Sequence, residues 1–425
     1  MTMKPVQVIA FFALMSHSAF PQLGNPPSPR AAANSFEQPG PVSARDFVPE
    51  NYLQGTLHKV WPQAENDGFN NAYWLETPSR TEEIIGSRSL MQRIRELYAL
   101  EHLRKLSKTD EFGKALAKSA EAKADSVVKA VRNPVDTLRK VPQGASRFFG
   151  RIGEGLKGGK SLNEDSSVLA AITGVTKAKA KLAAQLGVSP YTSNEELCME
   201  LDRTAQAMAG GGLLLGAGTS MVGGGLGTAL DIVSVKQTLQ DTLVNSTPED
   251  LRIFNRKKLT ALGVDLALAD EFLMHPWYSP WLETLITDAL MRTGVNPTPF
   301  LREACRALTL TDAAYFEQIA QVLALYDNTA KPLRCIQVEN GLICGLDVEG
   351  VLVIPLSCDF ALWTERTSRR AEEFIALTRG SDTPRGLALW VDGTISSRMA
   401  AELAARKVAV KTGVFSSFGG GARSR

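Results

Sequence analysis

Apolar and polar residues alternate in different ways along this chain, and each pattern predicts a different kind of structure. Within residues 46–77, two stretches of strand-forming residues, Tyr52–Val60 and Ala72–Leu75, flank the turn signal Glu65–Gly68. This arrangement predicts a short β-hairpin. Because an isolated hairpin is only marginally stable in water, we expect it to pack on the segments that follow.

Helical periodicity dominates residues 85–330. Thr247, followed by Pro248 and two acidic residues, is typical of a helix N-terminus. We expect that helix to run to Leu262 and to end at Gly263. Apolar residues three and four positions apart predict further helices at Ser87–Leu106, Leu169–Leu186, Trp281–Arg292 and Asp312–Tyr326.

Strand-like patterns return after Pro332. The segment Cys335–Cys344 has Asn340-Gly341 at its centre, which is the strongest short signal for a β-hairpin. A turn at Glu349-Gly350 then leads into the apolar strand Val351–Ile354. The rest of this module is predicted as a helix, a strand, a helix and a strand at Thr364–Thr378, Leu387–Val391, Ser396–Arg406 and Val408–Val410.

Together these patterns predict a mainly α protein, a helical bundle with a short N-terminal β-hairpin and a small C-terminal α+β module. Pro, Asn, Ser and Ala dominate the segment before the hairpin, and such a composition buries too little apolar surface to fold. We divide the chain into a signal peptide (1–22), a disordered linker (23–46), a β-hairpin element (47–84), a helical domain (85–330), an α+β module (331–411) and a disordered tail (412–425).

The first residues resemble an export signal. Lys4 precedes the apolar run Val6–Phe20, which is followed by small residues. A helix that spans a bilayer needs about 20 apolar residues, so we favour cleavage near residues 18–22 over a membrane anchor or a buried N-terminal helix. The sequence therefore predicts an exported protein, periplasmic or associated with a membrane face.

Five cysteines are too few for a disulfide-rich scaffold, and their odd number leaves at least one thiol outside any intramolecular pair. Two interpretations stay open for Cys335, Cys344 and Cys358. One is a disulfide within this group, and the other is a set of small buried apolar side chains.

Positive charge is concentrated in one stretch. The whole chain carries +2, but residues 102–181 hold 17 Lys and Arg against 8 Asp and Glu. Part of this stretch mixes cations with aromatic residues, as in helices that lie on anionic membranes. The alternative is a solvated basic face whose aromatic residues pack into the bundle. The residues expected to contact an anionic surface are Arg139, Lys140, Arg147, Phe148, Phe149, Arg151, Lys157 and Lys160.

Residues 204–230 carry no charge and include nine glycines. Small residues four positions apart let helices approach closely. Only residues 213–222 separate the two glycine triplets, about 15 Å of helix, which is half the thickness of a hydrocarbon core. We therefore favour a buried helical hairpin over a membrane-inserting or self-associating segment. The packing positions are Gly212, Gly216, Gly223 and Gly227.

Candidate catalytic groups are few. Each histidine outside the signal peptide lies in a different predicted element, so we expect neither a metal site nor a cofactor. Residues 387–394 resemble half of the haloacid-dehalogenase phosphatase motif, Asp-x-Asp-Gly-Thr, but Trp390 occupies the position of the nucleophilic aspartate. The alternative for this segment is a turn from strand to helix. Acidic residues that could serve a catalytic site in the C-terminal module are Asp392, Asp347 and Asp359.

These features favour a non-enzymatic envelope protein that binds an anionic lipid surface, an envelope polymer or a protein partner. Nucleic-acid binding is not expected, because no docking motif is present. Two alternatives stay open. One is a hydrolase-type enzyme with an acidic site in the C-terminal module, and the other is a membrane-active or self-assembling protein that uses the glycine-rich segment.

Overall fold

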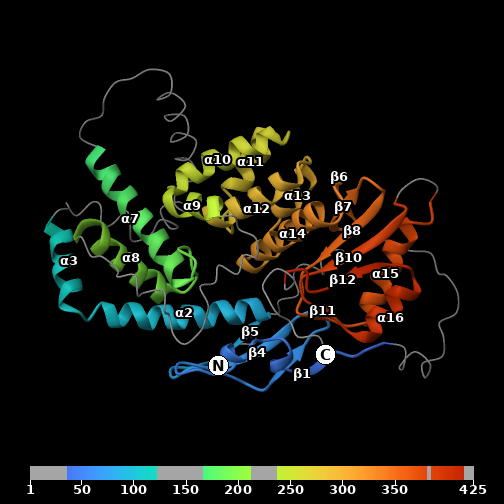
Figure 1. The fold of residues 1–425 in the computed structure, drawn as a ribbon, viewed down its shortest axis with the longest axis horizontal. Coiled ribbons are helices and arrows are strands. Elements are labelled where there is room, and N and C mark those ends of the chain that lie inside the picture. The colour runs from blue at the N-terminus through green and yellow to red at the C-terminus, as the bar shows by residue number, and fades with distance from the viewer. Residues whose placement is uncertain (1–35, 122–165, 212–236, 381–383, 416–425) are drawn as a thin grey trace, which may run out of the picture.

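The computed structural model describes residues 36–121, 166–211, 237–380 and 384–415 of the chain. Helices share the molecule with two five-stranded sheets, one near each end of the sequence (Figure 1). Helix makes up 53% of the structure and strand 18%. The expectation of a mainly α protein, a helical bundle with a short N-terminal β-hairpin and a small C-terminal α+β module, is therefore wrong, because a five-stranded sheet forms in each of the two end regions.

The N-terminal sheet is antiparallel and curls around its central strand, β4. This strand pairs with β5 on one side and with β2 and β3 on the other, and β1 extends the sheet beyond β3. Alternate residues of β4 are buried, as in a sheet with one face on a core. The strands are β1 (Gly40–Ser43), β2 (Lys59–Val60), β3 (Gln63–Asn66), β4 (Asn71–Glu76) and β5 (Thr81–Ile85).

Two properties of the sequence explain why a hairpin was predicted in place of this five-stranded sheet. The predicted strand Tyr52–Val60 contributes only its last two residues, as β2, while Glu50–Tyr52 forms a 3₁₀ helix. Strands β3 and β5 consist largely of polar residues, such as Glu65 and Glu83, that face outward. They belong to the sheet through pairing with β4 rather than through their own apolar pattern.

A helical arm leaves the N-terminal sheet. Its first helix, α2, packs Leu90 and Ile94 against the sheet and, two turns later, Leu100 and Leu103 against other helices of the arm. This long helix therefore connects the sheet to the far end of the molecule (Figure 1). The arm consists of α2 (Ser87–Leu106), α3 (Asp110–Glu121), α7 (Ser166–Leu186) and α8 (Glu195–Gly211).

A second group of helices lies between the arm and the C-terminal sheet. The predicted start of α10 is confirmed, since Thr247 and Asp250 form a reciprocal capping box and Pro248 is the first helical residue. That helix ends before Gly263, which has a φ of 81°. The group consists of α9 (Gln237–Asn245), α10 (Pro248–Ala261), α11 (Leu266–Leu273), α12 (Pro280–Thr293), α13 (Thr298–Ala304) and α14 (Leu310–Thr329).

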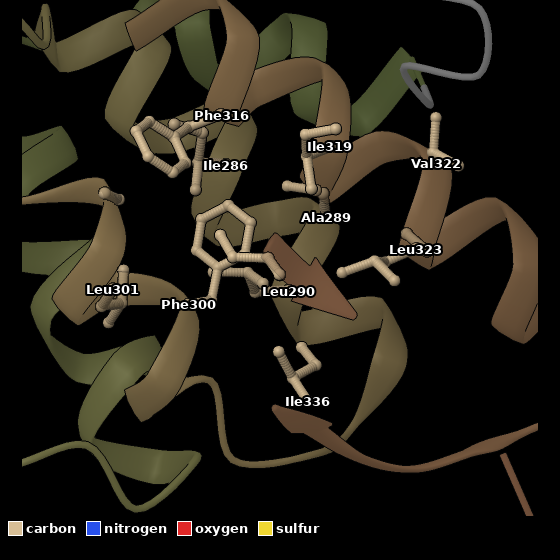
Figure 2. Packing of buried hydrophobic residues seen from close by; sticks show 14 of the residues in the cluster. Ile286, Ala289, Leu290, Phe300, Leu301, Phe316, Ile319, Val322, Leu323 and Ile336 are labelled. Atoms are coloured by element: carbon tan, nitrogen blue, oxygen red, sulfur yellow. The ribbon is translucent and has the colours of Figure 1, made fainter. Parts of the chain in front are cut away.

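The largest apolar core joins this helical group to the C-terminal sheet. Figure 2 shows the ring of Phe300 beside Leu290 of α12, with Phe316 of α14 above them and Ile336 of the sheet below. The centroids of the Phe300 and Phe316 rings lie 6.0 Å apart in an edge-to-face arrangement. Helices and sheet therefore share one core and do not form independent units.

The C-terminal sheet has the strand order β12-β10-β8-β7-β6. The first three strands in sequence form an antiparallel meander, and the predicted hairpin turn is confirmed by the positive φ of Asn340 and Gly341. Strands β8, β10 and β12 run parallel. The strands are β6 (Leu333–Glu339), β7 (Leu342–Asp347), β8 (Val351–Leu356), β10 (Gly386–Val391) and β12 (Ala409–Lys411).

Helices cover both faces of the C-terminal sheet and give it three layers. Helices α15 (Glu365–Leu377) and α16 (Ser397–Ala405) form the crossovers between the parallel strands. Their residues Phe374 and Leu403 pack on one face, while α14 packs on the other. A further pair of short parallel strands, β9 (Phe360–Ala361) and β11 (Thr394–Ile395), follows β8 and β10.

Candidate functional site

The parallel strands β8 and β10 end at the same edge of the C-terminal sheet, and polar residues follow each of them. Asp392 comes directly after β10, and Ser357 and Asp359 come just after β8. In open α/β sheets, ligands bind outside the carboxyl ends of parallel strands. This edge is therefore the place where the fold brings chemically active groups together.

Both oxygens of Asp392 are engaged. One accepts a hydrogen bond from the backbone N–H of Cys358 at 2.8 Å, and the other lies 2.8 Å from the hydroxyl of Ser357. That hydroxyl also contacts the side-chain oxygen of Gln318 from α14. Burial raises the pKa of Asp392. The nearby Arg88 guanidinium and the hydrogen bonds that the Asp392 carboxylate accepts oppose that shift.

The Ser357 hydroxyl has one proton and lies against two oxygen acceptors, so one of its neighbours must donate. If Asp392 is protonated, its O–H donates to Ser357, which then donates to Gln318. If the Gln318 amide is turned, its N–H₂ donates to Ser357, which then donates to ionised Asp392. The network therefore accommodates Asp392 with or without its proton.

Glu317 and Arg88 complete the cluster. Glu317 is 6% exposed, and its Oε1 has no hydrogen-bond partner among the described residues. Burial raises the pKa of its carboxyl group, against the opposing effect of Arg88. Arg88 also lies over the ring of Phe415, 5.6 Å from its centroid. The cluster therefore contains one ionisable side chain each from α2, from α14 and from the end of β10.

Asp359 has a structural role at the same edge. Its carboxylate accepts from the backbone N–H of Ser87 at 2.9 and 3.1 Å and from that of Asn71 at 2.9 Å. Gly86, the residue that precedes α2, offers no side-chain cap. Asp359 therefore caps α2 and binds β4 from the other end of the chain, so hydrogen bonds occupy both of its oxygens.

Asp347 lies at the opposite edge of the sheet, because β7 runs antiparallel to β8. It is 1% exposed, accepts from the Tyr326 hydroxyl at 2.7 Å and also accepts from the backbone N–H groups of Glu349 and Val351. These bonds fix the turn into β8. The structure therefore brings Asp392 and Asp359 to one edge and separates Asp347 from them.

Trp390, at the position of the missing nucleophile, is a core residue. Its ring packs edge-to-face on Tyr326, with centroids 4.9 Å apart. The turn interpretation of this segment agrees with the structure, since Ser396 caps α16 by accepting from the N–H of Met399. An added Cβ at Gly393 would lie 2.0 Å from the carbonyl oxygen of Cys358, so the close approach of the two loops requires glycine there.

Sequence reasoning missed Glu317, Gln318, Ser357 and Arg88. A signal for Glu317 was available, because α14 is apolar around much of its circumference and a charged residue in such a helix is buried. Arg88 carried no such signal. Its position beside Asp392 depends on where α2 meets the C-terminal sheet.

The residues expected to bind an anionic surface, and the four expected packing glycines, lie outside the described residues. Three described helices that flank them form one packed group in the arm, since α3 and α7 both pack on α8. A Cβ added at Gly210, near the end of α8, would lie 2.5 Å from the Oγ of Ser119, near the end of α3. A Cβ added at Gly174, in the third turn of α7, would contact Ala209 of α8 at 4.0 Å.

Within the described ranges, no cluster of three or more His, Cys, Asp or Glu side chains could hold a metal ion. Nor do those ranges contain a helix long and apolar enough to cross a bilayer. All five cysteines are free thiols. No protein-family model matches the chain, and no curated protein or solved structure is significantly similar to it.

Proposed function

We propose that this chain is an exported, non-enzymatic protein of the cell envelope that binds an anionic surface through residues 126–160 and the glycine-rich segment 204–230. Residues 126–160 contain eight cations and two acids, a net charge of +6. Their cations are Lys129, Arg132, Arg139, Lys140, Arg147, Arg151, Lys157 and Lys160, and their acids are Asp136 and Glu154.

The observation that carries this proposal is the packing of the helices that flank the two segments. The end of α3 and the start of α7 flank the basic segment, and the end of α8 leads into the glycine-rich one. α8 packs on α3 where Gly210 meets Ser119, and on α7 where Ala209 meets Gly174. The helices on either side of the two segments therefore belong to one packed group.

Electrostatic attraction to anionic lipid gives the proposal its salt dependence. Each basic residue near an anionic membrane contributes about 1 kcal/mol of attraction, which falls off within a Debye length. The basic segment supplies this attraction, because the exposed Lys114 and Lys118 of α3 are balanced by the exposed Asp110 and Glu111 of the same helix.

The test is co-sedimentation of the full chain with vesicles of anionic or zwitterionic lipid at low and high salt. We expect binding to anionic vesicles at low salt and its loss at high salt. Replacing Arg147, Arg151, Lys157 and Lys160 by Gln should weaken binding at least about tenfold.

A matched control replaces four exposed cations on other elements, Arg45, Lys59, Lys257 and Arg334, by Gln. This control has the same net charge as the test variant and should bind nearly as well as the natural chain. Equal weakening by both sets would show that only overall charge matters. Absence of binding to anionic vesicles at low salt would rule out the lipid-binding function.

A further inference from the structure

A second polar cluster lies in the arm, where α7 packs on α8. The Nζ of Lys179 lies 2.8 Å from a carboxylate oxygen of Asp202 and 3.3 Å from the sulfur of Cys198. The Cys198 thiol in turn lies 3.8 Å from the other oxygen of Asp202. Lys179 and Asp202 are buried, and Cys198 is partly exposed. A thiol, an amine and a carboxylate therefore lie in contact with one another, and Cys198 is the residue of the three that is open to solvent.

Cys198 differs from the other four cysteines in these surroundings. Burial raises the pKa of Cys344 and Cys358 far above the ordinary value for a thiol and that of Cys305 to about 12, which leaves these thiols unreactive. Cys335 is partly exposed, but its sulfur lies beside the Gln337 amide oxygen at 3.6 Å. Cys198 is also partly exposed, but its sulfur instead lies 3.3 Å from the Lys179 Nζ, which donates to it.

We propose that Cys198 is the oxidation-sensitive thiol of this protein and that, once oxidised by a peroxide, it is captured by Lys179 as a sulfenamide that cross-links α7 to α8. In the first step the thiol transfers two electrons to the O–O bond of the peroxide and becomes a sulfenic acid, with release of water. Lys179 then attacks the sulfur, an S–N bond forms, and the hydroxyl group leaves as a second water.

Asp202 allows the amine to act as a nucleophile. The ammonium of Lys179 must lose a proton before it attacks, and the carboxylate at 2.8 Å is in place to accept it. Burial raises the pKa of Asp202, which favours this transfer, although Lys179 and the Cys198 thiol oppose the shift. A second nitrogen-bound proton leaves with the hydroxyl group. A thiol reductant reverses the cross-link by breaking the S–N bond.

The experiment treats the full chain with hydrogen peroxide and follows each cysteine by peptide mass spectrometry. We expect the Cys198 thiol to disappear at least about ten times faster than that of Cys335. The product should be a linked pair of peptides that contain residues 179 and 198, lighter than the reduced pair by about 2 Da, the mass of two hydrogens. Dithiothreitol should restore the starting mass.

Two substitutions separate activation from capture. Lys179→Arg keeps a cation beside the sulfur but removes the amine, so Cys198 should still oxidise quickly and should accumulate as a sulfenic acid that dimedone traps. Cys335→Ser should leave the cross-link unchanged. Oxidation of Cys198 no faster than that of Cys335 in the natural chain would overturn the proposal, as would rapid oxidation that ends in sulfinic acid with no linked peptide.

Discussion

Glu283 lies in a buried polar contact between α10 and α12 and shows how a single residue couples stability to pH. Its carboxyl group is fully buried, and its partner Arg252 lies at 3.4 and 3.5 Å, long distances for hydrogen bonds. Burial raises the pKa of Glu283 to about 8, although Arg252 opposes the shift. The protonated acid is therefore the form that the fold favours near neutral pH.

We predict that the free energy of unfolding falls as pH rises from about 5 to about 8, by at most about 1.4 kcal/mol per pH unit from this group. The sign follows because the folded state holds the proton at a pH where the unfolded chain has lost it. The stabilisation is complete below the unfolded pKa and is lost as pH rises through the folded one. Urea unfolding at several pH values measures the slope.

The variant Glu283→Gln keeps the shape of the protonated acid and should remove this part of the pH dependence. As a control, Glu65→Gln changes an exposed carboxyl group on β3 and should leave the slope unchanged. An unaltered slope in Glu283→Gln would mean that Glu283 is ionised in the folded protein throughout this range.

At the scale of elements, the packing of α3 on α8 depends on a close approach at Gly210. An added Cβ there would lie 2.5 Å from the Oγ and 3.1 Å from the Cα of Ser119, so α3 would have to move. Gly113 of α3 is also helical and has nothing within 4 Å of an added Cβ. The two glycines therefore differ in their surroundings but share the same helical conformation.

We predict that Gly113→Ala stabilises the protein by about 0.5–1 kcal/mol, because alanine favours helix. Gly210→Ala should destabilise it by about 1–3 kcal/mol through overpacking. Adding Ser119→Gly to the Gly210→Ala chain should restore part of the loss. Thermal unfolding compares the variants, and equal stabilisation by both alanines would mean that the ends of α3 and α8 do not touch.

The elements that the sequence predicted correctly have local causes. Asn340-Gly341 defines its hairpin within two residues, and Thr247 caps α10 by contacts within one turn. The N-terminal sheet was predicted only in part. Ala72–Leu75 lies in β4 as expected, but most of the other strands were missed because they are short, partly polar and defined by pairing with β4. At the candidate site, Asp392 was identified from the strand it follows. Arg88 and Ser357 could not be, because only the tertiary structure brings α2, β8 and β10 together.

At the scale of the whole molecule, hydrogen bonds between distant residues join the N-terminal sheet to the C-terminal module. Asp359 binds the start of α2 and β4, and the backbone N–H of Asp359 donates to the carbonyl of Phe69 at 3.0 Å. Glu37 accepts from the N–H of Trp363 at 2.6 Å. The two ends of the chain therefore form one structural unit.

We predict that Asp359→Ala destabilises the protein by about 2–4 kcal/mol, because it leaves two amide groups in the interface without their acceptor. Its control is Asp265→Ala, which removes the local cap of α11 and should cost about 1 kcal/mol. Urea unfolding gives both values. Hydrogen exchange should show faster exchange in β4 and at the start of α2 only for Asp359→Ala, and equal effects of the two substitutions would contradict the tertiary role of Asp359.

The cap that Asp359 provides also constrains the order in which the chain folds during synthesis. Ser87 and Asp359 are 272 positions apart. At about 5–20 residues per second, a ribosome needs on the order of 15–50 s to make the intervening chain. During that time α2 lacks its cap and the N-terminal sheet lacks the module it packs on. The N-terminal sheet and the start of α2 are therefore synthesised first but acquire their last contacts late. Contacts between residues so distant in sequence also favour slow folding.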